Sequence, residues 1–206
     1  MVALLLLSNL AYAGSNGVCL VRIEPNGGGS GFFVDDNKII TAYHVIDGCI
    51  DNQRRVRIEF DGKTAIAKVI RFNVDTDVAL LEAEVEGETI LKLADNPPKI
   101  GDKVINRGHP KSKWDVHKGE GTLKEIATLI RTYTDGTKSK TKQYITQSHV
   151  IEGMSGGPVF NENEEVIGLI SARTLDFTQA YCPTLEQLKE ILEEDTLELT
   201  SPENSK

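Results

Sequence analysis

The chain has 206 residues, of which 39% are hydrophobic and 26% charged, a composition that suits one globular unit with a sizeable core. Its formal net charge is −8, and its Lys and Arg residues form no dense cluster. The charge pattern therefore argues against a nucleic-acid partner.

The first 13 residues hold a short apolar run that ends in Ala11-Tyr12-Ala13, the small-x-small form of a signal-peptidase site. They predict a signal peptide and an exported protein, either periplasmic or extracellular. Because no Lys or Arg precedes the run, a truncated lipid anchor and a buried first strand are the alternatives. No other apolar run approaches the ~20 residues of a membrane span, so we expect no stable membrane insertion after cleavage.

Short apolar and β-branched runs separated by turn signals predict an all-β barrel or sandwich. The runs lie at residues 18–24, 31–34, 38–45, 54–60, 65–72, 77–83, 102–108, 143–147, 158–160 and 165–171. Exposed turns are expected at Asp36-Asn37 and at Asn161–Glu164. A soft boundary near residues 94–102 divides the chain into halves of similar length.

The glycine-rich segment Asn26–Gly31 lacks the Lys-Ser/Thr pair of a phosphate-binding P-loop and does not open a helix. It is better interpreted as a flexible hairpin that leads into a strand. Near the end of the chain the spacing of the apolar residues changes from that of a strand to that of a helix. Leu185, Leu188, Ile191 and Leu192 share one helical face. A helix is predicted over 184–194 with a Thr184–Gln187 capping box, followed by a disordered acidic tail, 195–206.

Three cysteines, Cys19, Cys49 and Cys182, match no metal-ligand spacing, and we expect neither a metal nor an organic cofactor. In an exported protein, one disulfide and one thiol are the simple expectation, with Cys19–Cys49 preferred. The alternative is three buried thiols that act as small hydrophobic residues.

The stretch "IEGMSGGPVF", residues 151–160, places Ser155 among glycines, which is typical of a tight turn and also of a nucleophile loop. In the second case the N–H groups of Gly153 and Ser155 can hold a developing oxyanion. A serine hydroxyl also needs a base that is oriented by a third group. His44 in "TAYHV" and Asp77 in "DTDVALL" are the candidates, although either residue alone is more typical of packing or of a turn.

Three segments together, "GSGFFVDDNKIITAYHVIDG", "DTDVALL" and "GMSGGPVF", resemble in order the His, Asp and Ser segments of trypsin-like serine proteases of the chymotrypsin fold. The details are most similar to the bacterial HtrA/Deg-like branch. The resemblance implies two six-stranded antiparallel β-barrels, of about 14–96 and 97–183, followed by the C-terminal helix, with the site in the cleft between the barrels.

The resemblance also implies the roles of the site residues. Ser155 would attack the scissile carbonyl of a polypeptide substrate, His44 would accept its proton, and Asp77 would fix the His44 tautomer. Asp75 is also within reach, but the family pattern places the acid immediately before the "VALL" strand. The N–H groups of Gly153 and Ser155 would form the oxyanion hole.

Departures from the family pattern modify these expectations. Met154 occupies the position where many digestive relatives carry an aspartate that pairs with a new N-terminus, so that mode of activation is not expected. HtrA relatives carry a C-terminal PDZ domain, whereas residues 195–206 are all that follow the helix here, so none is expected in this chain.

The substrate pocket implied by the resemblance is lined by His149, Ser171, Ala172 and Arg173. It lacks a carboxylate, so a Lys or Arg preference is not expected. We first expect a preference for small or medium apolar side chains such as Val or Ala before the scissile bond, and second a preference for acidic side chains. The alternative is that Arg173 points to solvent and does not line the pocket. A protease-fold binding protein with a closed site is the alternative to an endopeptidase, and an esterase with the same triad stays open.

Overall fold

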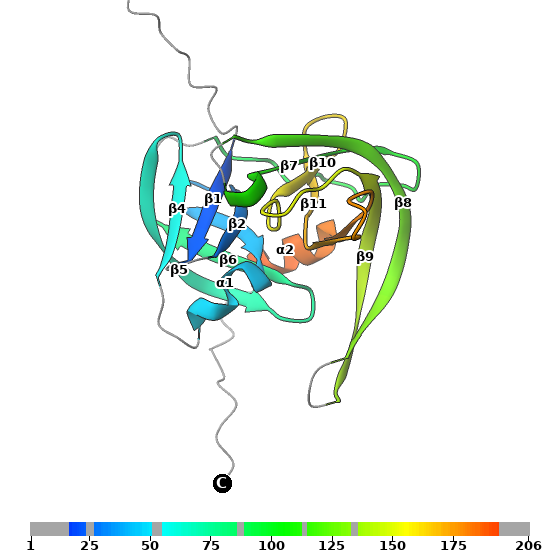
Figure 1. Cartoon of the computed structure of the whole chain (residues 1–206), viewed down its shortest axis with the longest axis horizontal. Coiled ribbons are helices and arrows are strands. Elements are labelled where there is room, and N and C mark those ends of the chain that lie inside the picture. Colours follow the sequence, from blue (N-terminus) through cyan, green and yellow to red (C-terminus); the bar gives the residue numbers. More distant parts are fainter. Residues whose placement is uncertain are drawn as a thin grey trace, which may run out of the picture.

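The computed structural model describes residues 17–23, 27–50, 55–85, 89–112, 115–132 and 136–193. The predicted signal peptide, 1–13, and the predicted acidic tail, 195–206, lie outside these residues. The regular secondary structure in the described part of the chain is mainly β-strand, with two short α-helices (Figure 1). The all-β prediction is therefore confirmed.

Six antiparallel strands of the N-terminal half close into a barrel with the order β1-β2-β3-β6-β5-β4, in which β4 pairs with β1. The strands β1, β3 and β6 are buried almost throughout, because they pack on the barrel interior and on elements outside it. The strands are β1 Val18–Ile23, β2 Gly28–Phe33, β3 Lys38–Ala42, β4 Val56–Phe60, β5 Lys63–Asn73 and β6 Val78–Ala83.

The helix α1, Tyr43–Ile50, follows β3 without a break. Its buried face consists of Val45, Ile46 and Cys49, which join the apolar cluster of the barrel. The same packing fixes the first turn of the helix, where His44 lies, against the end of β3.

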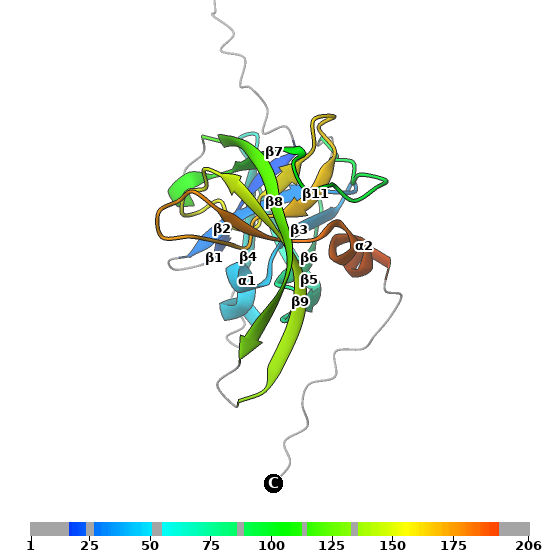
Figure 2. The same ribbon diagram turned by 90° about the vertical axis from the view of Figure 1, so that its right-hand side faces the viewer.

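The second sheet has seven strands in the order β11-β10-β7-β8-β9-β13-β12. In Figures 1 and 2 the long strands β8 and β9 arch around one side of the molecule and extend past the barrel. The strands are β7 Lys103–Gly108, β8 His117–Thr132, β9 Lys138–Ser148, β10 Pro158–Phe160, β11 Val166–Leu169, β12 Ala172–Arg173 and β13 Ala180–Pro183.

This sheet corrects the expectation of a second closed six-stranded barrel. Among the described residues β11 and β12 do not pair with each other and form the two ends of the sheet. The outer edge of β11 is occupied instead, because Val166 bridges to Leu93 of the connecting segment and Gly168 bridges to Thr184. The edge that would have closed the barrel therefore already has partners.

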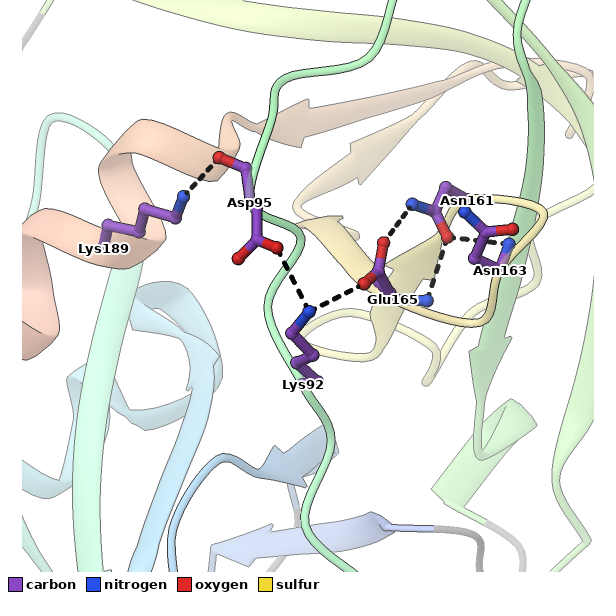
Figure 3. Close-up of polar contacts among 6 residues, drawn as sticks. All are labelled: Lys92, Asp95, Asn161, Asn163, Glu165 and Lys189. Atoms are coloured by element: carbon purple, nitrogen blue, oxygen red, sulfur yellow. Dashed lines mark hydrogen bonds and ion pairs between the residues drawn. The ribbon is translucent and has the colours of Figure 1, made fainter.

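The connecting segment between the two sheets is held at the β10–β11 turn (Figure 3). Lys92 Nζ lies 3.0 Å from Glu165 Oε1 and 3.2 Å from Asp95 Oδ2, and Lys189 Nζ donates to the Asp95 carbonyl. Asn161 Oδ1 accepts the backbone N–H of Glu165, which confirms the predicted turn. Exposed ion pairs stabilise little, so the backbone bonds between Val166 and the segment carry most of this attachment.

The second helix, α2, spans Leu185–Glu193 and contacts β5, β6 and β11. Gln187 Oε1 accepts the N–H of Thr184 at 2.7 Å, which is one arm of the predicted capping box. At the other end Arg71 donates to the Ile191 carbonyl at 2.9 Å. The predicted helix is confirmed, with Leu185, Leu188 and Ile191 on its buried face.

The preferred Cys19–Cys49 disulfide is not formed, and Cys19, Cys49 and Cys182 are all buried thiols. Cys19 and Cys49 pack within the barrel cluster and Cys182 within the cluster of the second sheet. Their role as small hydrophobic residues, which was the alternative interpretation, fits this packing.

Two features are absent from the described residues. No helix among them is both long and apolar enough to cross a bilayer. They contain no group of three or more His, Cys, Asp or Glu side chains that could hold a metal ion.

Candidate active site

His44 and Asp77 form a hydrogen-bonded pair at the rim of the barrel. The ring Nδ1 of His44 lies 2.8 Å from Asp77 Oδ2, and the backbone N–H of His44 donates to Asp77 Oδ1 at 2.9 Å. The His44 side chain is 44% exposed, whereas that of Asp77 is 3% exposed. An ionised carboxylate only accepts hydrogen bonds, so Nδ1 carries the proton and the exposed Nε2 of neutral His44 is an acceptor.

The backbone geometry of Asp77 is unusual, because its φ of 60° lies in the left-handed region. Aspartate and asparagine adopt this conformation more readily than other non-glycine residues. The carbonyl of Asp77 also accepts the N–H of Tyr43, so backbone and side chain both bind the start of α1. Asp77 is therefore held against the segment that carries His44.

Opposing effects set the pKa of Asp77. Burial raises it, but the hydrogen bond and charge of His44, the Ser171 hydroxyl and the His44 N–H together hold the pKa below the usual 3.8. Asp77 is therefore ionised at neutral pH although it is buried.

The Ser171 hydroxyl donates to Asp77 Oδ2, the same oxygen that faces His44 Nδ1. Ser171 was predicted to line the substrate pocket, and in the structure its hydroxyl binds the acid of the pair. Sequence reasoning missed this contact because Ser171 follows Asp77 by 94 positions and lies between β11 and β12 of the second sheet.

The loop around Ser155 is a run of tight turns. Gly153 and Gly156 have φ of 93° and 84°, values that favour glycine, and Met154 is fully buried. The N–H groups of Met154, Gly156 and Gly157 donate to backbone carbonyls. Within the described part of the chain, by contrast, the N–H groups of Gly153 and Ser155 have no protein acceptor.

This loop lies against the barrel. The N–H of Ser30 in β2 donates to the Ser155 carbonyl at 2.7 Å. A Cβ on Gly156 would lie 2.4 Å from Thr41 Oγ1 and 2.9 Å from Ala42 N, so the loop reaches the strand that precedes His44. Among the described residues, however, the Ser155 hydroxyl has no hydrogen-bond partner, and the bond to His44 that a triad requires is not made.

The four predicted pocket residues fall into two pairs, because His149 and Arg173 lie beside Phe177, whereas Ser171 and Ala172 line a hollow beside Asp77. The exposed His149 ring lies 5.7 Å from His117 and 6.4 Å from Phe177, and the Arg173 guanidinium stacks on Phe177 at 4.1 Å. Burial and the charge of His149 lower the pKa of His117. Arg173 thus packs on an aromatic ring, and Phe177, which the sequence did not single out, connects it with His149.

Ser171, Ala172 and Asp77 line a hollow of about 320 Å³. The rest of this hollow is formed by the β8–β9 hairpin, β13 and the Asp77 loop, through Asp75, Leu129, Ile130, Arg131, Thr141, Gln143 and Tyr181. A larger hollow of about 760 Å³, at the β4–β5 turn, includes none of the predicted site residues.

The molecule has a closed six-stranded barrel beside a second β-sheet. A His–Asp pair lies at the barrel rim, and a glycine-bounded serine loop lies on the second sheet. Together these features define the class of chymotrypsin-like proteins. Solved structures support the fold. The active form of the Rv3671c protease from M. tuberculosis has a TM-score of 0.79 at 22% identity and covers 86% of this chain and 80% of that one. Deg5 has a TM-score of 0.71 at 20% identity and covers 85% and 87%.

Sequence comparison then identifies the family. Residues 29–169 match the model of the trypsin-like peptidase domain, and the chain belongs to this family. It is similar to Protease Do-like 2, chloroplastic, of Arabidopsis thaliana, with 31% identity over 145 residues, 68% of this chain and 23% of that protein. It is also similar to Serine protease Do-like HtrB of Bacillus subtilis, with 33% identity over 146 residues, 68% of this chain and 30% of that protein.

Other relatives are named as a DegP-like serine endoprotease of Rickettsia conorii and as Serine protease HTRA1 of Xenopus laevis, which confirms the resemblance inferred from the three motifs. The chain matches less than a third of the length of each of these relatives. Its own activity, substrates and partners are therefore addressed below as proposals.

Proposed function

We propose that this chain is a serine endopeptidase that hydrolyses peptide bonds through His44, Asp77 and Ser155 and a covalent acyl-enzyme. The observation that carries the proposal is the buried, ionised Asp77 bound to Nδ1 of an exposed His44. A histidine held in this way presents Nε2 to solvent as a base, which is what a serine nucleophile needs.

In the first step Ser155 Oγ attacks the carbonyl carbon of the scissile bond while its proton passes to His44 Nε2. The proton then moves from His44 to the leaving amine, which departs with the C-terminal part of the substrate. Water repeats the same sequence on the ester and releases the acid. Asp77 keeps its negative charge throughout and stabilises the imidazolium that forms in each half-reaction.

The oxyanion of each tetrahedral intermediate would be held by the N–H groups of Gly153 and Ser155. The support is that both lack a protein acceptor among the described residues, whereas the neighbouring N–H groups of the loop are engaged. Donors that are already free of protein acceptors need no rearrangement as charge develops.

The missing Ser155–His44 hydrogen bond favours a second candidate, a protease-fold binding protein with a misordered site. Catalytic hydrogen bonds are often loose without substrate, so this observation weighs less than the intact His44–Asp77 pair. An endopeptidase is therefore the preferred function.

Export is proposed on the Ala11-Tyr12-Ala13 site and on the name of a 32% identical Rickettsia conorii relative, a periplasmic DegP-like serine endoprotease. Polypeptides are the proposed substrates, and nucleic acid is not a proposed partner.

The test is cleavage of a denatured protein mixture by the wild type, Ser155→Ala and His44→Ala, with new N-termini identified by mass spectrometry. We expect many new termini with wild type and a loss of several orders of magnitude in both variants. A folded wild type that produces no new termini would support the binding protein. Turnover in Ser155→Ala close to that of wild type would refute the triad.

A further inference from the structure

Ser30, in β2 of the barrel, is fully buried and makes hydrogen bonds through every polar group that it has. Its N–H donates to the Ser155 carbonyl at 2.7 Å, and its own carbonyl accepts the Thr41 hydroxyl at 2.7 Å. Its hydroxyl donates to the Gly153 carbonyl at 2.9 Å and accepts the His109 N–H at 2.8 Å.

The direction of the hydroxyl proton is fixed. A serine hydroxyl has one proton, and a backbone N–H can only donate. Because the His109 N–H occupies an acceptor site of Ser30 Oγ, the single proton points to the Gly153 carbonyl. The bond between Ser30 and Gly153 therefore has one orientation.

The two carbonyls that Ser30 binds belong to Gly153 and Ser155, the residues whose N–H groups form the proposed oxyanion hole. The peptide units that contain these carbonyls are also bound on their other side, because Met154 N–H donates to Ile151 and Gly156 N–H donates to Ile170. A planar peptide unit fixed at both ends cannot rotate. This arrangement limits the rotation of the two donor residues.

Ser30 also connects the loop with the base. Thr41, which donates to the Ser30 carbonyl, is also fully buried and lies three residues before His44, at the end of β3. Close packing reinforces the contact, because a Cβ on Gly156 would lie 2.1 Å from the Ser30 carbonyl oxygen. One barrel residue thus contacts both the strand that precedes His44 and the loop that carries Ser155.

We propose that Ser30 is a positioning residue that sets the Gly153 and Ser155 N–H groups relative to His44. The inference rests on the proposed endopeptidase function. In Ser30→Ala the Gly153 carbonyl and the His109 N–H both lose a buried partner, while the His44–Asp77 pair keeps all its contacts. Because the donors stay present, we expect kcat to fall about 10- to 100-fold, less than the 10²–10³ typical of a deleted donor, with KM changed less than about threefold.

The experiment measures kcat, KM, the pH profile of kcat/KM and the inhibition constant of a peptide aldehyde, whose serine adduct places an oxyanion in the hole. For Ser30→Ala we expect the aldehyde to bind more weakly by about the same factor as the loss in kcat/KM. The midpoint of the pH profile should stay where it is in wild type.

Ser148→Ala is the matched control. Ser148 is another buried serine, and its hydroxyl bonds to Asn106 and Thr146 within the second sheet. Both variants should lower Tm, but only Ser30→Ala should weaken aldehyde binding. If Ser30→Ala does not fold, Ser30→Cys, which keeps the side chain's shape with a weaker donor, replaces it, and a smaller loss of the same kind is expected.

The outcomes separate the two proposals. A folded wild type that neither cleaves peptides nor binds the aldehyde overturns the endopeptidase function and the role of Ser30 with it. An active wild type with unchanged kcat and aldehyde affinity in the Ser30 variant overturns the role of Ser30 alone. Equal losses in the Ser30 variant and in Ser148→Ala also overturn it, because a general destabilisation would then explain both.

Discussion

Replacing Asp77 with asparagine tests how the histidine is oriented without distorting the backbone. Asparagine tolerates the φ of 60° at this position, whereas alanine would add strain of about 1–2 kcal/mol. The carboxylate accepts hydrogen bonds on both oxygens, and Oδ2 alone receives the His44 ring and the Ser171 hydroxyl. In Asp77→Asn an NH₂ group replaces one of these oxygens.

If the NH₂ group takes the Oδ2 position, it faces two donors, and the conflict is relieved when His44 moves its proton from Nδ1 to Nε2. That tautomer cannot accept the Ser155 proton. We expect kcat to fall about 10⁴-fold, the loss found for this change in the Ser-His-Asp template, which corresponds to about 5.5 kcal/mol. The free energy of unfolding should fall by less than about 3 kcal/mol, because the lost charged hydrogen bonds are partly offset by no longer burying a charge.

The assay is steady-state hydrolysis of a peptide substrate found in the cleavage screen, with Asp75→Asn as the control, since Asp77 is the carboxylate that binds the His44 ring. Stability should also respond to pH. The pKa of Asp77 is lowered on folding, so its contribution is complete above the unfolded value of about 3.8 and is lost as pH falls through the folded value. A folded Asp77→Asn variant within tenfold of wild-type kcat would refute the tautomer argument.

Three further predictions concern neighbouring features. A Cβ on Gly29 would lie 2.6 Å from the Ser155 carbonyl oxygen, so Gly29→Ala should lower kcat at least about tenfold. In the control Gly27→Ala the new Cβ would have no contact closer than 3.8 Å, and kcat should stay within about twofold of wild type. Equal effects of the two substitutions on kcat would contradict the packing. Burial raises the pKa of the Cys182 thiol to about 12. Alkylation at pH 8 followed by mass spectrometry should therefore label Cys182 only in the unfolded protein, and rapid labelling of Cys182 in the native protein would contradict its burial. In peptide-library profiling, Arg173→Ala should abolish any preference for acidic side chains before the scissile bond and leave an apolar preference intact. A dominant preference of the wild type for Lys or Arg would refute both the apolar and the acidic expectation.

The strands of the barrel were predictable because buried strands consist mainly of apolar residues, which form visible runs in the sequence. Residues 38–42 and 78–83, for example, are buried almost throughout and appear in the sequence as apolar runs. The second sheet was predicted less well. All of β8 and the first part of β9 were missed, because the outer part of the β8–β9 ribbon is exposed and its sequence has no apolar pattern that marks one buried face.

The site was predictable where local motifs carry it and not where distant segments meet. The motifs paired His44 with Asp77, and the structure brings these two side chains together. The bonds of Ser171 to Asp77 and of Ser30 to Gly153 span 94 and 123 positions, and neither residue type distinguishes such a contact from a solvated serine. Residues Asn26–Gly31 were interpreted as a flexible hairpin that leads into a strand. The strand begins earlier than expected, at Gly28, and its glycines permit close approach of the Ser155 loop.

Fluorophosphonate labelling of the native protein, with the modified residue mapped by mass spectrometry, tests the central claim most directly. The proposed function predicts one adduct, on Ser155, in wild type, because only a serine activated by a base and an oxyanion hole reacts at neutral pH. The adduct should be absent from His44→Ala and strongly reduced in Asp77→Asn. A folded wild type without an adduct on Ser155, or an adduct that forms equally fast in His44→Ala, would contradict the account.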